Sequence, residues 1–152
     1  MQILKNKKII EDHWQHIADD PIPPEGRITV STARWKSERD ALIARDGELG
    51  LRISPEDRIE DFAQDLLNFQ LIGLEFPAFT DGRLFSVASM LRHHYGFKGE
   101  IRALGEFIRD QIFFLFRVGV DSFEIKQPSD LEDALSAFDD FSVHYQAARD
   151  ER

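Results

Sequence analysis

The residues best suited to chemistry stand together in the stretch FPAFTDGR, residues 76 to 83. Thr80 supplies a hydroxyl, Asp81 a carboxylate and Arg83 a guanidinium. Gly82, between the acid and the base, allows the tight turn that the chain needs after an apolar run. A carboxylate beside a guanidinium combines an acid–base group with an anion clamp, so Asp81 is the candidate catalytic residue.

A second group of polar residues follows the next apolar run, EIRALG. If both segments leave neighbouring strands at one edge of a sheet, they line one cleft, with Glu75 and Glu124 at its floor. Arginines at such an edge suit a phosphate, a sulfur oxyanion or a carboxylate. The predicted binding residues are Thr80, Asp81, Gly82, Arg83, Ser86, Arg102, Arg109, Asp110 and Gln111.

The same residues also have a purely structural interpretation, which stays open at this point. Asp81 can cap the helix that follows it, with Gly82 as a turn residue. Arg83 and Arg109 can pair with acids on helix surfaces, and Gln111 can satisfy a backbone group in an apolar helix.

The elements that would position these residues alternate along the chain between apolar runs and amphipathic stretches. Capping-box spacings begin at Ser54 and Ser129, and apolar stripes at helical spacing follow them. This pattern predicts five βα units, with strands at RITVS, LGLRIS, LIGLEFPAF, EIRALG and DSFEIK and helices near 33 to 46, 55 to 69, 83 to 95, 105 to 118 and 130 to 145.

The predicted fold class is α/β, with a mostly parallel sheet, because parallel neighbours need a crossover and a helix supplies it. The five units fit either an open sheet or a half-barrel. A closed eightfold barrel needs about 200 residues or more, which this chain of 152 residues lacks. In both arrangements ligands sit beyond the carboxyl ends of the strands.

The first residues have a different pattern from the rest. QILK and KKIIEDHW alternate polar and apolar residues around Asn6 and Lys7, which predicts an edge hairpin. The proline-rich PIPPEG then links it to the main unit. The predicted organisation is a hairpin extension at residues 1–20 and a single α/β domain at residues 26–148.

Composition narrows the classes of partner and cofactor. A formal charge of −9 without any basic run argues against binding to nucleic acid. Without cysteine there is no disulfide and no thiolate nucleophile. No apolar run approaches the roughly 20 residues of a membrane span, so we expect a cytoplasmic protein. Dinucleotide, P-loop and nucleophile-elbow motifs are missing and the histidines lack ligand spacing, so neither a cofactor nor a metal is predicted.

The stretch EFIRDQIFFLFRVG is apolar around nearly its whole circumference, whereas a helix that covers one sheet face needs only a stripe. A second helix of the same chain, a homo-oligomer contact or a protein partner would bury its other side.

Residues 75 to 125 resemble the signature region of the bacterial domain of unknown function 934. The matching elements are FPAFTDGR, Ser86, LR at 91 and 92, YGFKGEIRA, the turn at Gly105, RDQ at 109 to 111, and FE at 123 and 124. The resemblance implies a gene beside the assimilatory sulfite reductase, and a frequent oxidoreductase label without an established reaction. The chain departs from the family pattern at Leu84, at His93 with His94, and at Val118, where a cysteine is common. A thiol at that position is therefore not required here.

Three functions are compatible with these features. The first, implied by the resemblance, is an accessory protein of assimilatory sulfite reduction that docks on a sulfite reductase component. The alternative is a small enzyme or binding protein for an anionic metabolite at the carboxyl ends of the strands. A flavin or nucleotide binder at the same edge ranks third, and whether the chain is an enzyme stays open.

Overall fold

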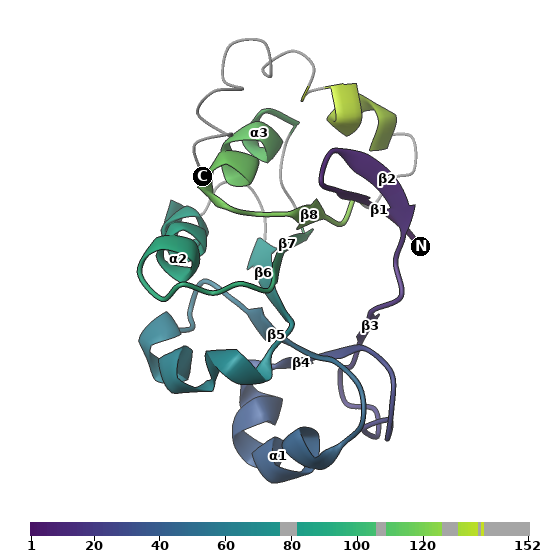
Figure 1. Ribbon diagram of the computed structural model, residues 1–152, viewed down its shortest axis with the longest axis vertical. Coiled ribbons are helices and arrows are strands. Elements are labelled where there is room, and N and C mark those ends of the chain that lie inside the picture. Colours follow the sequence, from purple (N-terminus) through teal and green to yellow (C-terminus); the bar gives the residue numbers. More distant parts are fainter. Residues whose placement is uncertain (77–81, 106–108, 126–130, 137, 139–152) are drawn as a thin grey trace.

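The computed structural model describes residues 1–76, 82–105, 109–125, 131–136 and 138 (Figure 1). They form one sheet of eight strands in the order β2-β1-β8-β7-β6-β5-β4-β3. The strands are β1 (Gln2–Lys5), β2 (Lys8–Glu11), β3 (Gln15–His16), β4 (Ile28–Ser31), β5 (Leu49–Ile53), β6 (Leu71–Phe76), β7 (Glu100–Gly105) and β8 (Ser122–Phe123).

The sheet is mixed. Strands β3 to β8 pair in parallel, and each of β4 to β8 lies beside the strand that precedes it in sequence. The hairpin β1–β2 adds two antiparallel strands, because β1 pairs with β8 at Leu4 and Phe123. Its turn residues Asn6 and Lys7 both have positive φ, at 50° and 66°, which suits a two-residue hairpin loop. The predicted hairpin therefore extends the same sheet.

The helices are α1 (Thr32–Ala44), the 3₁₀ helix η1 (Ile59–Asn68), α2 (Gly82–His93) and α3 (Arg109–Val118), and residues 131–136 are also helical. The Ser31 hydroxyl caps α1 by accepting a hydrogen bond from the Arg34 N–H at 3.2 Å. The stretch 55 to 69 was predicted as an α-helix, which is wrong. Its buried residues Ile59, Phe62 and Asp65 recur every third position, the repeat of a 3₁₀ helix.

The sequential strand order explains the curled shape. Right-handed crossovers that always advance in one direction place every helix on the same face, as in a barrel, whereas a doubly wound sheet must reverse direction. In Figure 1, α1, α2 and α3 lie on one side of the sheet, and the chain from the hairpin to β3 runs along the other. The α/β class and the half-barrel are thus confirmed, with a mixed sheet of eight strands.

The apolar core lies between the sheet and the helices. Alternate strand residues such as Leu51, Ile72 and Ile101 point into it and are fully buried, and Trp35 of α1 and Phe62 of η1 meet them from the helical layer. Each such side chain contributes about 1.5–3 kcal/mol when buried. In the described ranges, no helix combines the length and the apolar character needed to span a bilayer.

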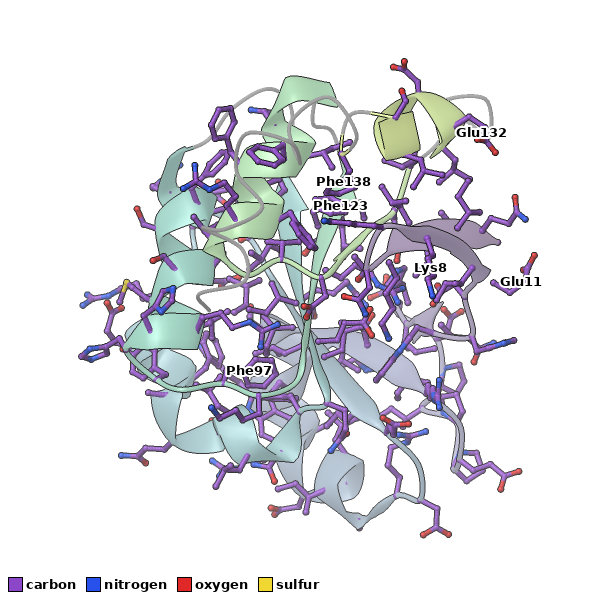
Figure 2. The ribbon with its side chains drawn as sticks, turned by 45° about the horizontal axis from the view of Figure 1, so that its top comes forward. Lys8, Glu11, Phe97, Phe123, Glu132 and Phe138 are labelled. Atoms are coloured by element: carbon purple, nitrogen blue, oxygen red, sulfur yellow. The ribbon has the colours of Figure 1, made fainter. Side chains whose placement is uncertain are left out.

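A segment of the same chain packs on α3. The ring of Phe138 lies 5.1 Å from that of Phe116 and 6.4 Å from that of Phe123 (Figure 2). Of the predicted helix at 130 to 145, residues 131–136 and 138 are described and helical. Phe114 of α3 still has 48% of its surface exposed, so the apolar circumference is covered in large part from within the chain.

Replacing Gly105 with alanine tests the junction at the end of β7. Gly105 has φ +92°, and an added Cβ would lie 2.2 Å from the Phe76 carbonyl oxygen on β6. We expect Gly105→Ala to lower the free energy of unfolding by about 3 kcal/mol, measured by urea denaturation. Gly96→Ala is the control, because Gly96 has φ +65° and open space around it; its loss should be about 1 kcal/mol. Equal losses would contradict the steric argument.

Candidate functional site

The concave face of the sheet carries a row of polar residues. Cross-strand pairing places Arg52 of β5, Gly73 of β6, Arg102 of β7 and Ser122 of β8 in one row. Register partners in neighbouring strands project from the same face, and the residues before and after them project into the apolar core. The row therefore brings two arginines to the face that carries no helix.

Arg102 is the centre of an ion-pair network, although only 1% of its surface is exposed. Its Nη1 lies 2.9 Å from Asp12 Oδ1 and 3.1 Å from Glu124 Oε2, and its Nη2 lies 2.9 Å from Glu100 Oε2. Its Nε donates to the Ser122 hydroxyl at 3.1 Å. A buried guanidinium is tolerated only when its donors are paired, and here they meet three carboxylates.

The network fixes the charge of its carboxylates. Burial raises the pKa of Glu100, but hydrogen bonds from Ser122, Lys5 and Arg102 and the charge of Arg102 outweigh it and hold the pKa below its ordinary value. Burial likewise raises the pKa of Glu124, but hydrogen bonds and charges of His16 and Arg102 together outweigh it and hold the pKa below its ordinary value. Burial lowers the pKa of Arg102, yet its acidic neighbours raise it above the ordinary value. All three groups are therefore ionised at neutral pH.

The segment between β2 and β3 closes this network over the concave face. Asp12 follows β2 at one edge of the sheet, and His16 lies on β3 at the other edge. His16 Nε2 lies 2.6 Å from Glu124 Oε2, next to β8. Because four strands separate β3 from β8 in the sheet, this contact forms only when the sheet curls.

The order Thr29, His16, Glu124 resembles a nucleophile–base–acid relay. The Thr29 hydroxyl lies 2.6 Å from His16 Nδ1, and His16 Nε2 lies 2.6 Å from Glu124. Thr29 is 0% exposed, however, and its hydroxyl also accepts a hydrogen bond from Arg52 Nη1 at 2.7 Å. A nucleophile must reach its substrate and needs its lone pair free, so this arrangement is structural.

Arg52 differs from Arg102 in its partners. It donates to the carbonyl oxygens of Thr29 and Ile17, each at 2.8 Å, and to the Thr29 hydroxyl. Burial lowers the pKa of Arg52, and the more distant charges of Glu75 and Glu124 only partly offset this. Among the residues that the structure describes, no carboxylate contacts Arg52, so it is the concave-face cation best placed to meet an external anion.

Four charged or titratable residues lie on or directly after strands of the sheet, towards the carboxyl ends: Arg52, Glu75, His16 and Glu124. We call these four residues the mouth of the half-barrel. Glu75 is the penultimate residue of β6 and is half-buried. Across the described part of the chain, no three His, Asp or Glu side chains are arranged to hold a metal ion.

Residues 50–152 match the family model described as "Bacterial protein of unknown function (DUF934)". The chain belongs to this family. The match begins within β5, so it includes Arg52, Glu75, Arg102 and Glu124 of the concave face. No curated protein and no solved structure matches the chain.

The two DUF934 segments predicted to share a cleft begin side by side. Strands β6 and β7 are neighbours, and their last residues, Phe76 and Gly105, are register partners. Thr80 and Asp81 lie outside the described residues, so the candidate catalytic role of Asp81 stays a prediction. Gly82 is the first residue of α2.

The other predicted site residues belong to three different environments. Arg83 and Ser86 are exposed on α2, whereas Gln111 is buried in α3. Arg109 and Asp110 begin α3, and their side chains are outside the described set. Arg102 lies on the concave face, where its guanidinium is committed to internal ion pairs.

Sequence reasoning missed Asp12, His16, Thr29 and Arg52 as members of the polar face. Arg52 had a usable signal, because an arginine inside the apolar run LGLRIS must project from the face opposite the core. The contact of His16 with Glu124 spans 108 residues, and no local pattern marks it.

Acid sensitivity follows from the lowered pKa of Glu124. A carboxylate whose pKa is lower in the folded state stabilises the fold above its ordinary value of 4.5; this stabilisation is lost as the pH falls through the folded-state pKa. We expect the free energy of unfolding to drop between pH 5 and pH 3, and Glu124→Gln to be less stable at pH 5 with a shallower drop. Urea denaturation across this range measures both.

Glu25→Gln is the matched control, because Glu25 is exposed in the proline-rich link. Its curve should follow that of the wild type. If Glu124→Gln also follows the wild-type curve, the ion pairs of Glu124 do not contribute to the pH dependence of stability.

Proposed function

We propose that this member of the DUF934 family is an accessory protein of assimilatory sulfite reduction that docks on a component of the sulfite reductase system. The resemblance in sequence implies a gene beside the assimilatory sulfite reductase. The family match covers residues 50–152. The role requires a surface for the partner rather than a catalytic centre.

A pair of exposed apolar side chains supplies the observation that carries the proposal. Leu67 of η1 has 98% of its surface exposed and Ile43 of α1 has 49%. Both line one shallow cavity of about 250 Å³ between the two helices. We call Ile43 and Leu67 the apolar pair. An exposed apolar pair beside a small hollow is the type of feature that protein interfaces bury.

The chemistry of the concave face also favours docking over catalysis. Within the described residues, the ionised groups around Arg102 satisfy one another, and the relay-like Thr29 is fully buried. The formal charge of −9 adds a preference for a partner with a basic surface.

Deleting the gene should slow growth on sulfate or sulfite as the sole sulfur source and leave growth on sulfide or cysteine normal. The tagged protein should co-elute with the reductase, and Leu67→Glu should abolish both co-elution and complementation, because a buried unpaired charge weakens an interface strongly. Ile10→Glu is the control, since Ile10 is an exposed apolar residue on β2 at the far edge of the sheet. Normal growth of the deletion strain on sulfate would refute the role.

Binding of an anionic metabolite at the mouth is the second candidate, and the partners of Arg52 favour it. We expect calorimetry to detect sulfite, sulfate or phosphate, and Arg52→Met to weaken that binding by about tenfold or more. Arg58→Met serves as the control, because Arg58 lies on the surface with 76% of its side chain exposed. No binding by the wild type, or equal binding by Arg52→Met, would exclude this candidate.

A further inference from the structure

A cavity of about 550 Å³ lies at the amino ends of β7 and β8, at the opposite end of these strands from the mouth. Its volume is in the range typical of sites for small ligands. The charged and titratable residues that line it are Lys5, Arg92, His93, Lys98, Glu100 and Asp121. They come from the hairpin, the end of α2, the turn before β7, the first residue of β7 and the residue before β8.

The turn before β7 contains one residue whose side chain the fold does not use. Phe97 is buried below α2 (Figure 2), and its carbonyl accepts a hydrogen bond from Arg92 Nη1 at 2.8 Å. Gly99 leaves no room for a side chain, because a Cβ would lie 2.7 Å from the Gln70 carbonyl oxygen. Lys98, between them, is exposed at the cavity.

The two acids of the cavity are already neutralised. Glu100 Oε1 accepts from Lys5 Nζ at 2.9 Å, and Glu100 Oε2 accepts from Arg102 and from the Ser122 hydroxyl. Asp121 pairs with Arg92 and also accepts the Ile101 N–H at 3.0 Å. Lys98 is therefore a surplus positive charge at this site.

Unused donors accompany that charge. In the part of the chain that the structure describes, neither the Lys98 ammonium nor the consecutive backbone N–H groups of Lys98 and Gly99 meet an acceptor. Unused N–H groups and a lysine ammonium are donors of the kind that oxyanions accept.

We propose that this cavity binds a small oxyanion, a phosphate or sulfate group, through the Lys98 ammonium and the N–H groups of Lys98 and Gly99. The oxyanion is either free in solution or the terminal group of a phosphorylated metabolite. This site is independent of the accessory role and of the mouth, since it shares no residue with the apolar pair or with Arg52.

The test is a titration of the full chain labelled with ¹⁵N, with inorganic phosphate, inorganic sulfate and adenosine monophosphate as three separate probes. Sodium chloride keeps the ionic strength constant. The amide resonances of Lys98 and Gly99 should shift and saturate with at least one probe. Tighter binding of the monophosphate than of inorganic phosphate identifies a phosphorylated metabolite as the source, and equal or weaker binding identifies the free oxyanion.

Lys98→Ala should weaken the saturating shift by about tenfold or more, because a charge-assisted hydrogen bond is lost. Lys36→Ala removes the same charge from the exposed face of α1 and should bind like the wild type. The proposal is overturned if no probe shifts these two amides, if Lys98→Ala binds as well as Lys36→Ala, or if saturating shifts occur only around Arg52. The last outcome would leave the second candidate function in place and remove this site alone.

Discussion

The guanidinium of Arg102 is buried at the point where three separate parts of the chain meet. It bonds to Asp12 of the N-terminal segment, to Glu100 of its own strand and to Glu124 after β8. Glu100 in turn holds Lys5 of the hairpin, and Glu124 holds His16 of β3. A buried ion that loses one partner costs about 3–5 kcal/mol, so the hairpin, the central strands and the edge strand β3 depend on one another through this residue.

The same network explains how a half-barrel can exist without its missing half. In a closed barrel, inward side chains from all eight strands pack in layers and exclude water. Here the sheet supplies only part of such a ring, and the segment carrying Asp12 and His16 crosses the open side instead. A polar filling suits this arrangement, because the concave face is shielded by one thin segment rather than by helices. The acid–base pairs also fix the position of that segment on the sheet. Apolar contacts alone would fix it less tightly.

The elements that follow local rules were predictable, and those that depend on distant contacts were not. The alternation of apolar runs with amphipathic stretches predicts β4 to β8, and Asn6 and Lys7 mark the hairpin turn. The spacing of Ile59, Phe62 and Asp65 fits a 3₁₀ repeat, but the apolar stripe of this stretch also fits an α-helix, so the sequence alone does not decide between them. The adjacency of β6 and β7 followed from the crossover rule. No local pattern around Arg102 predicts its contact with Asp12, 90 positions earlier. A residue expected to line a binding cleft is instead buried at the centre of an ion-pair network.

Gln70 lies between the apolar pair and the cavity at Lys98. Its side-chain carbonyl accepts the Leu49 N–H at 2.8 Å beside the apolar pair, and its backbone carbonyl accepts the Glu100 N–H at 2.9 Å beside the Lys98 turn. The apolar pair and the oxyanion cavity therefore adjoin at the amino ends of the strands, while Arg52 and Glu75 lie nearer the carboxyl ends. A partner seated on Ile43 and Leu67 would lie next to the turn that carries Lys98 and would leave the mouth uncovered. The proposed docking at the apolar pair and the proposed oxyanion binding at Lys98 thus share one end of the half-barrel, opposite the end where enzymes of barrel type place their chemistry.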